Sequence, residues 1–116
     1  MSDSIANILV INNKTIRLDK RGYLQNLSDW DKGVAEALAI KEGLELDQGH
    51  WEVIELLRSF HQQSGLVPST RALVKLMAKD LGESKGKSMY LMKLFPQTPL
   101  KLACKIAGLP RPINCI

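Results

Sequence analysis

The sequence has few of the residues on which compact chemical sites usually depend: its 116 residues include two cysteines and two histidines. Two cysteines are too few for a disulfide scaffold, so we expect a reducing, cytoplasmic compartment. No apolar run approaches the roughly 18 residues that a membrane-spanning helix needs. The first residues also lack the basic region and long apolar stretch of a secretory signal. We therefore expect neither a membrane span nor a disulfide-rich secreted fold.

What is present is an ordinary globular composition with an uneven charge. Hydrophobic residues make up 45% and charged residues 24%, which suits one domain with one modest core. Residues 1–67 hold seven Lys and Arg against ten Asp and Glu, whereas residues 68–116 hold nine against two. A basic half attracts RNA, DNA or an acidic patch on a protein partner. A solvated, lysine-rich helical surface accounts for the same pattern without any ligand.

Hydrophobic periodicity predicts a mainly α (α+β) protein. Two short β-branched runs flank an Asn-rich turn, which predicts an N-terminal β-hairpin over about residues 8–24. An isolated hairpin is only marginally stable, so it should pack against helices. From Trp30 onward the apolar spacing becomes helical and predicts a bundle of about five short helices, over residues 30–43, 47–65, 69–82, 84–95 and 98–108.

Capping residues and prolines mark the ends of these helices. Asp47 is a good N-cap for the second helix, and Thr98 followed by Pro99 starts the last one. Two prolines keep the final eight residues from being helical. We therefore predict a helical domain over residues 1–108 and an extended C-terminal arm over residues 109–116. In the fourth helix, the side chains expected to face partly inward are Met89, Leu91, Met92 and Phe95.

Two familiar kinds of site are disfavoured by spacing. The segment from Gly82 to Ser88 has three residues between its glycines and follows a helix, whereas a phosphate loop needs four and a preceding strand. It is better interpreted as a polar turn between helices. His50 and His61 lie eleven residues apart, without a neighbouring ligand at zinc spacing or an activated nucleophile. We expect a first-turn position for His50, a surface or groove position for His61, and no metal.

A helix-turn-helix pattern crosses the middle of the chain. Two predicted helices are joined by a turn with glycine and a Pro-Ser start, as in many DNA-binding units. Arg71, Lys75 and Lys79 recur every four residues on one face of the second helix, where they could follow a phosphate backbone. Base recognition normally uses Arg, Asn or Gln near the start of that helix, and only Arg71 qualifies. A plain helical corner with an exposed basic face is the alternative.

The two cysteines are the sharper feature. Cys104 lies in the last predicted helix, and Cys115 is the penultimate residue, after a Pro-x-Pro spacer. The arm up to Cys115 can extend roughly 20–25 Å. It could present its sulfur in another protein's cleft, or fold back to Cys104, where a disulfide would constrain the unfolded chain by about 3 kcal/mol. Arg111, and Lys105 if the arm folds back, would favour the thiolate, whereas the carboxylate of Ile116 would oppose it. A free thiol on a frayed tail is the plain alternative.

Four segments carry a family resemblance: HWEVIELLRSF, ALVKLMAKDLG, KGKSMYLMKLFP and above all ACKIAGLPRPINCI. They resemble the DsrC/TusE family of sulfur-carrier proteins over nearly the whole chain. The ending is the most specific part, because a Gly-Leu-Pro-basic-Pro arm with a penultimate cysteine is rare elsewhere. The resemblance implies a small helical fold with an N-terminal hairpin and a mobile C-terminal arm. Sulfur transfer itself requires no cofactor or metal.

The resemblance also implies roles for the cysteines. Cys115 would accept sulfane sulfur as a persulfide and pass it on. In the TusE branch the donor is the TusBCD complex, and the acceptor is the enzyme that 2-thiolates the wobble uridine of certain tRNAs. In the DsrC branch the arm enters dissimilatory sulfite reductase, and a second cysteine takes part. Cys104 stands where that second cysteine occurs, whereas Ile113-Asn114 is closer to the TusE ending, so we favour a TusE-like relay that retains Cys104.

Two hypotheses from different classes result. The first is a cytoplasmic, sulfurtransferase-type carrier, rather than a stand-alone turnover enzyme, that acts through Cys115. In it Cys104 is the resolving partner, and Arg111 supports the thiolate or docking. The second is a helix-turn-helix nucleic-acid-binding protein that uses residues 69–81. The first hypothesis adds that oxidation joins Cys104 to Cys115 within one chain.

Overall fold

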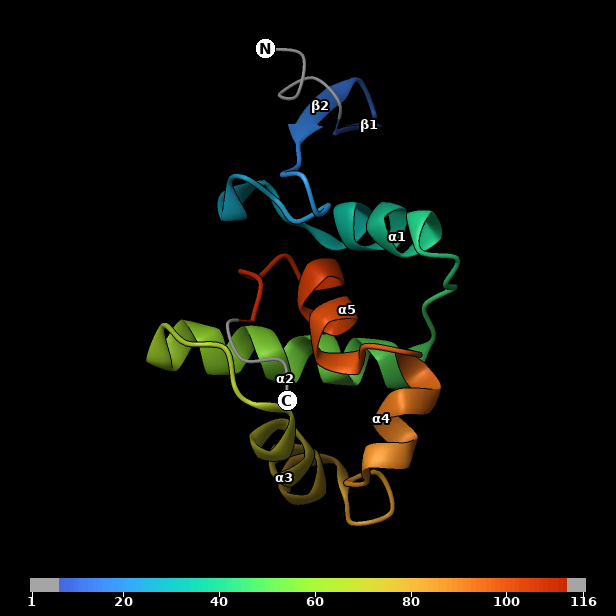
Figure 1. Cartoon of the computed structure of the whole chain (residues 1–116), viewed down its shortest axis with the longest axis vertical. Helices are drawn as coiled ribbons and strands as arrows, with labels where there is room; N and C mark the ends of the chain where they lie inside the picture. Colours follow the sequence, from blue (N-terminus) through green and yellow to red (C-terminus); the bar gives the residue numbers. More distant parts are fainter. Residues whose placement is uncertain (1–6, 113–116) are drawn as a thin grey trace.

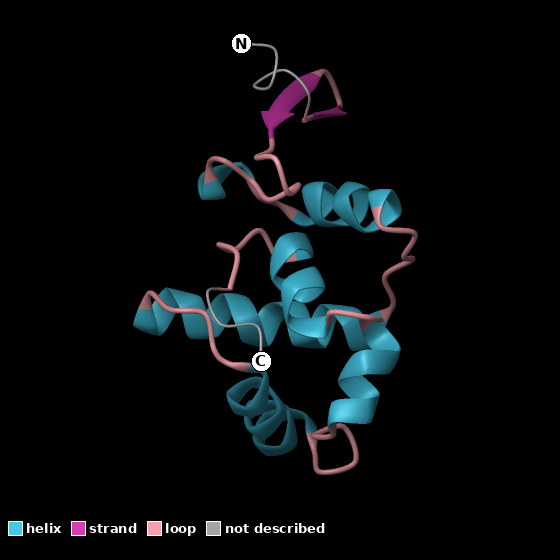
Figure 2. Cartoon of the chain, viewed as in Figure 1, coloured by secondary structure: helices cyan, strands magenta, loops and turns pink. Residues whose placement is uncertain are grey.

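The computed structural model describes residues 7–112 of the chain. A two-stranded hairpin leads into a set of α-helices, in which α5 stands between α1 and α2 (Figure 1), and helix dominates the described part (Figure 2). The predicted mainly α class with an N-terminal hairpin is confirmed. The elements are β1 (Ile8–Ile11), β2 (Lys14–Arg17), the 3-10 turn η2 (Leu27–Asp29), α1 (Lys32–Lys41), α2 (Gln48–Ser64), α3 (Thr70–Leu81), α4 (Ser88–Leu94) and α5 (Pro99–Ile106).

The hairpin forms as its sequence predicts. Strands β1 and β2 pair antiparallel, with Ile11 opposite Lys14. Asn12 and Asn13 between them have φ of 48° and 67°, the left-handed conformation that tight hairpin turns require and that Asn tolerates. Ile16 is only 2% exposed, and β1 contacts α1, so the hairpin is packed on the helices rather than isolated.

Helix α1 starts two residues later than the periodicity suggested. The Asp31 carboxylate caps it by accepting from the Val34 amide at 2.9 Å. Trp30 therefore precedes the helix, in extended backbone, and its indole is free to pack elsewhere. The prediction that Trp30 is helical was wrong, because Asp31 is the stronger N-cap signal.

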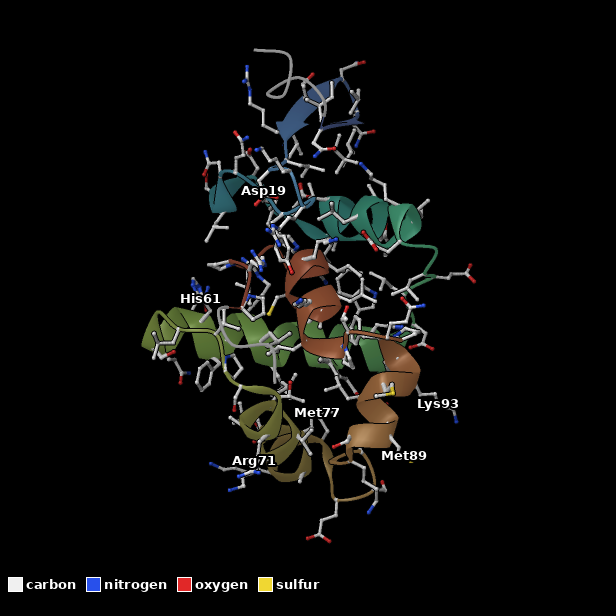
Figure 3. The ribbon with its side chains drawn as sticks, in the orientation of Figure 1. Asp19, His61, Arg71, Met77, Met89 and Lys93 are labelled. Atoms are coloured by element: carbon white, nitrogen blue, oxygen red, sulfur yellow. The ribbon has the colours of Figure 1, made fainter. Side chains whose placement is uncertain are left out.

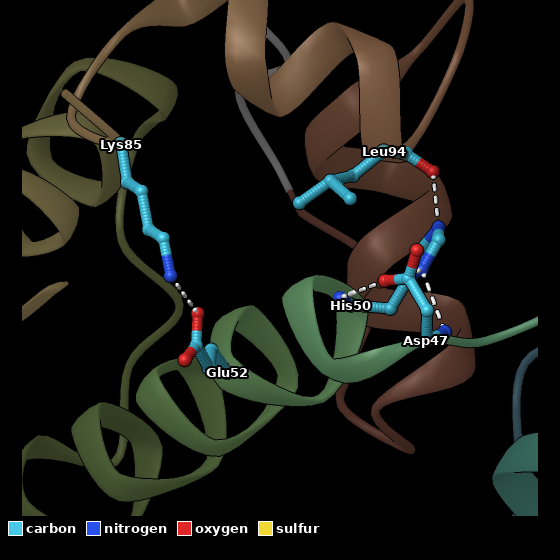
Figure 4. Close-up of polar contacts among 5 residues, drawn as sticks. All are labelled: Asp47, His50, Glu52, Lys85 and Leu94. Carbon is cyan, nitrogen blue, oxygen red and sulfur yellow. Dashed lines mark hydrogen bonds and ion pairs between the residues drawn. The ribbon is translucent and has the colours of Figure 1, made fainter.

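Helix α2 begins with a reciprocal cap. The Asp47 carboxylate accepts from the His50 amide at 3.3 Å, and His50 Nδ1 accepts from the Asp47 amide at 3.1 Å (Figure 4). These bonds lower the pKa of Asp47, with the His50 amide as the largest cause. The other ring nitrogen, Nε2, donates to the Leu94 carbonyl at 2.8 Å, so His50 ties α2 to α4. Asp47 and His50 are thus the predicted N-cap and first-turn residues.

Helices α2 and α3 form the predicted helix-turn-helix order. Gly65 ends α2 with φ of 73°, and Ser69 Oγ caps α3 by accepting from the Ala72 amide at 3.1 Å. Leu73 and Met77 of α3 are fully buried. The corner is therefore a packed part of the domain.

The segment before α4 is a tight turn between two helices, as predicted. It passes so close to α3 that a Cβ on Gly86 would lie 2.7 Å from the Ala78 amide nitrogen and closer still to the Ala78 Cα and Cβ. Lys85 in this turn pairs with Glu52 of α2 at 3.0 Å (Figure 4). Helix α4 begins at Ser88 and not at Ser84, so the predicted start was four residues too early.

Two of the four inward side chains predicted for the fourth helix are confirmed, because Leu91 and Phe95 are buried. Met89 and Met92 are 82% and 52% exposed, so the prediction that they face inward was wrong; Figure 3 labels Met89 on α4. The buried side chains at this place are Leu91, Leu94 and Phe95.

Helix α5 is the centre of the core. It contacts α1, α2 and α4, and Pro99 occupies its first position as predicted. Its buried side chains are Leu100, Ala103, Cys104 and Ile106. Among residues 7–112, no helix combines the length and apolarity that crossing a bilayer requires.

Candidate functional site

The predicted second cysteine lies inside the core. Cys104 is 0% exposed on α5. Burial raises the pKa of its thiol to about 12, because the charged thiolate loses its hydration there. At neutral pH the thiolate fraction is therefore on the order of 10⁻⁵, and only the thiolate is a competent nucleophile. In this conformation Cys104 is a packed, unreactive side chain.

The chain turns back over Cys104 as it leaves α5. Gly108 has φ of 72°, and the Leu109 amide donates to the Cys104 carbonyl at 3.0 Å. Leu109 itself is 3% exposed. The first residue of the predicted arm is thus bonded to the residue that carries the buried thiol.

Two side chains from distant elements clamp this end of α5. Trp30 Nε1 donates to the Ile106 carbonyl at 2.9 Å, and Arg58 Nη1 of α2 donates to the Ala107 carbonyl at 2.7 Å. The Arg58 guanidinium also stacks on the Trp30 ring, 3.8 Å from its centroid. Burial lowers the pKa of Arg58, because the guanidinium loses hydration, but the group stays charged at any physiological pH.

Gly108 completes the clamp, because no other residue fits beside Trp30. A Cβ at this position would lie 2.6 Å from Trp30 Cγ and closer still to Cδ1, and the positive φ disfavours any L side chain. We call Trp30, Arg58 and Gly108 the arm clamp. Its members lie far apart in the sequence, so no local pattern links them or predicts the roles of Arg58 and Trp30.

The described part of the arm alternates between packed and exposed residues. Leu109 and Pro112 are buried, whereas Pro110 and Arg111 between them are exposed. Arg111 borders two cavities, one of about 450 Å³ beside α5 and one of about 350 Å³ along residues 65–69. Cys115, the predicted persulfide carrier, lies outside the described residues, so its role and its pairing with Cys104 stay predictions.

The predicted basic face of α3 is exposed and separate from the arm clamp. Arg71, Lys75 and Lys79 all lie at the surface, and Figure 3 shows Arg71 projecting from α3. Arg71 and Lys75 border a shallow cavity of about 740 Å³ together with Val74 and Ser88. The structure therefore places Arg111 near the end of α5 but does not bring the α3 cations to it.

The histidines form no metal site in the part of the chain that the structure describes. Within it, no group of three or more His, Cys, Asp or Glu side chains is placed to hold a metal ion. His61 is half-buried near the end of α2, and His50 is used in the cap described above. His50 thus has a structural role in joining helices.

Comparison with known proteins supplies the family. The family model described as "DsrC like protein" matches residues 10–116. The chain belongs to this family. The sulfurtransferase TusE of Yersinia pestis is 47% identical over 109 residues, which are 94% of this chain and 100% of that protein. The TusE of Salmonella typhimurium is 46% identical with the same coverage.

Solved structures share the fold of this DsrC-like chain. The NMR structure of Allochromatium vinosum DsrC has a TM-score of 0.87 and 42% identity, and the match covers 95% of this chain and 98% of that one. The crystal structure of the oxidized gamma-subunit of dissimilatory sulfite reductase from Archaeoglobus fulgidus has a TM-score of 0.85 and 41% identity, with coverages of 95% and 100%. The resemblance recognised in the sequence is confirmed.

Proposed function

We propose that this DsrC-like protein is a sulfur-relay carrier that accepts sulfane sulfur as a persulfide on Cys115 and passes it to a downstream protein. The observation that carries the proposal is the arm clamp, which fixes the end of α5 immediately before an arm with a penultimate cysteine. A rigid root and proline residues reduce the entropy that the arm loses when it docks into a partner. Relatives named sulfurtransferases that match over 94% of this chain and 100% of their own length support the same class.

The proposed transfer needs only thiol chemistry. The Cys115 thiolate attacks the outer sulfur of a donor persulfide, the donor S–S bond breaks, and the donor cysteine leaves as a thiolate. The new S–S bond makes Cys115 a persulfide, with no net oxidation or reduction. An acceptor thiolate then attacks the outer sulfur of Cys115 in the same way. The protein acts as a carrier rather than as a stand-alone turnover enzyme.

Cys104 has a conditional role in this proposal. Its thiolate would attack the inner sulfur of the Cys115 persulfide, form a Cys104–Cys115 disulfide and release hydrosulfide. Burial and the raised pKa of Cys104 oppose this reaction while the arm clamp is closed. The clamp would thus protect the carried sulfur, and opening of this end of α5 would make Cys104 the resolving cysteine.

For the route, we favour tRNA wobble-uridine 2-thiolation, with a TusBCD-like donor complex and a tRNA-thiolating acceptor enzyme, in the cytoplasm. The curated relatives named TusE support this route. A specific observation supports the second route, through dissimilatory sulfite reductase: this chain has a cysteine at position 104, and its structural neighbours include that enzyme's gamma-subunit. In either route Arg111, exposed on the arm, would aid docking or thiolate formation.

A second candidate function is nucleic-acid binding through α3. The exposure of Arg71, Lys75 and Lys79 on one face supports it, since such a face can follow phosphates. It predicts salt-sensitive binding to duplex DNA that is lost on changing Arg71 and Lys75 and unchanged in Cys115→Ser. Absence of such binding at low salt would leave α3 as a solvated face.

The carrier proposal is tested by intact-mass measurement after incubation with a persulfide donor. We expect a reducible adduct of about 32 Da, one sulfur atom, that is absent in Cys115→Ser and kept in Cys104→Ser. The buried Cys104→Ser change is checked for folding by circular dichroism. An adduct that persists in Cys115→Ser, or no adduct in the wild type, would contradict the proposal.

A further inference from the structure

A cavity of about 450 Å³ lies beside α5, and its charged lining is mostly cationic. It is bordered by the turn after β2, the segment after α1, the side of α5 from Lys101 to Lys105, the residues just before α5, and the arm. One carboxylate contributes, that of Glu42, against four cationic side chains: Arg21, Lys101, Lys105 and Arg111. Polar atoms make up much of the wall, so the cavity is not an apolar groove.

Only one of these cations is neutralised by a described side chain. Lys105 Nζ pairs with Glu42 at 3.1 Å and also lies 5.5 Å from the Tyr23 ring centroid. Within residues 7–112, Arg21, Lys101 and Arg111 have no carboxylate within ion-pair distance. Like charges gathered around one cavity repel one another and create a positive potential there. An anion would offset that repulsion.

The backbone adds to the same potential. Lys101 lies in the first turn of α5, where unpaired amides and the helix dipole favour negative charge. Thr98 occupies the N-cap position, but its side chain makes no capping hydrogen bond, whereas Asp47 and Ser69 cap α2 and α3. The start of α5 is thus an uncapped helix end that borders a cationic cavity.

We propose that this cavity binds a tetrahedral oxyanion of the phosphate or sulfate type. Arg21 and Arg111 offer forked guanidinium donors, which suit such oxygens, and Lys101 adds a point charge beside them. Since Arg111 belongs to the arm, a bound anion ties the arm to α5. Anion binding in this cavity does not depend on sulfur transfer.

The test is a titration of the reduced, full-length protein with sodium phosphate and with sodium sulfate, followed by ¹H–¹⁵N NMR. Sodium chloride at matched ionic strength is the reference. We expect saturable shifts of the amides of Lys101 and of Gly22, which follows Arg21 and lies beside the Lys105 side chain, with phosphate or sulfate and not with chloride. Shifts that are linear, equal to those with chloride, or centred on α3 would overturn the proposal.

Charge-removing variants locate the site. We expect Lys101→Gln, Arg21→Gln and Arg111→Gln each to weaken binding about three- to tenfold, the loss of one charged contact. Lys79→Gln removes the same charge from exposed α3 and is expected to leave the affinity unchanged. Arg111 is exposed on the arm, so its variant tests the site without threatening the fold. Equal affinities in all four variants would refute the assignment.

A short RNA oligonucleotide identifies the source of the oxyanion. If it displaces phosphate from the same amides and binds more tightly, the cavity holds a phosphodiester of nucleic acid; if only the inorganic ions bind there, it holds a free oxyanion. Binding of neither kind of probe overturns the proposal. Persulfide loading of Cys115, measured on Lys101→Gln and Arg21→Gln, keeps this outcome distinct from failure of the proposed sulfur relay.

Discussion

The two ends of α5 are built in opposite ways. At the C-terminal end, carbonyl groups are covered by Trp30 and Arg58, and the thiol of Cys104 is fully buried. At the N-terminal end, no side chain caps the helix, and cationic side chains, among them Lys101, lie around a cavity. One end is closed by specific bonds, and the other is open to a ligand.

The two ends of this eight-residue helix therefore differ in what they offer: one packs the start of the arm, and the other borders a positively charged cavity. The closed end holds Leu109, the first residue of the arm, and burial there keeps the Cys104 thiol protonated at neutral pH. The open end presents positive charge close to Arg111, which is exposed on the same arm. Disturbing either end should therefore have distinct consequences, and the following predictions run from the largest effect to the smallest.

Gly108→Ala should destabilise the protein more than any other change considered, through the C-terminal end of α5. The new Cβ would lie 2.6 Å from Trp30 Cγ, and φ of 72° is strained for alanine. We expect the free energy of unfolding to fall by about 3 kcal/mol, from overpacking and backbone strain together. Urea denaturation of the wild type and the variant measures this difference.

Gly43→Ala is the matched control for that change. Gly43 also has a positive φ, 77°, but a Cβ there would meet nothing within 4 Å. Its loss should be limited to backbone strain, about 1 kcal/mol. Equal losses in the two variants would show that contact with Trp30 does not matter.

Arg58→Ala should loosen the same end without a steric clash. It removes the 2.7 Å bond to the Ala107 carbonyl and the stacking on Trp30. We expect a loss of about 2 kcal/mol in stability and faster labelling of Cys104 by a thiol reagent, in a Cys115→Ser background. Arg71→Ala, which changes an exposed arginine of α3, serves as control and should alter neither quantity. Unchanged labelling of Cys104 in Arg58→Ala would argue against a clamp over this thiol.

The buried thiol also predicts a pH dependence. Because the pKa of Cys104 is raised to about 12 from an ordinary value near 9, the folded state holds its proton more tightly than the unfolded state. Stability from this group is therefore complete below pH 9 and is lost as the pH rises toward 12. At pH 10 the loss relative to pH 7 should be about 1.4 kcal/mol.

Other groups titrate in the same range, so the measurement is a difference. Urea unfolding at pH 7 and pH 10 is compared between Cys115→Ser and the same protein with Cys104→Ala added. The extra loss at pH 10 should vanish in the second protein. If both lose the same stability, the Cys104 thiol is more solvated than its burial indicates.

The features that the sequence predicted depend on neighbouring residues, whereas those that it missed depend on contacts between distant segments. The start at Pro99, the hairpin turn and the Asp47 cap depend on neighbours within a few residues, and all three are present. The arm clamp instead joins Trp30 and Arg58 to carbonyls 76 and 49 residues away. No periodicity encodes such contacts, because they arise only when the helices pack.

The failures have the same origin. Apolar residues lie on both sides of α4, so its periodicity alone does not show which side is buried. Packing buries the side of Leu91 and Leu94 and leaves Met89 and Met92 exposed. The cationic cavity likewise collects residues from four separate segments. Family resemblance pointed to Cys115 and Cys104, yet only the packed structure shows that Cys104 is covered.

Thr98→Asp should produce the smallest effect, at the open end. A carboxylate at the N-cap of α5 interacts favourably with the helix dipole, so stability should rise by about 0.5 kcal/mol. The same negative charge should compete with a bound oxyanion and weaken phosphate binding in the NMR titration. Ser69→Asp is the control, because Ser69 already caps α3 through the Ala72 amide and is absent from the lining of the cationic cavity. If Thr98→Asp gains stability and binds phosphate with unchanged affinity, the N-terminal end of α5 contributes nothing to the anion site. The difference between the two ends of α5 would then depend on the cationic side chains alone.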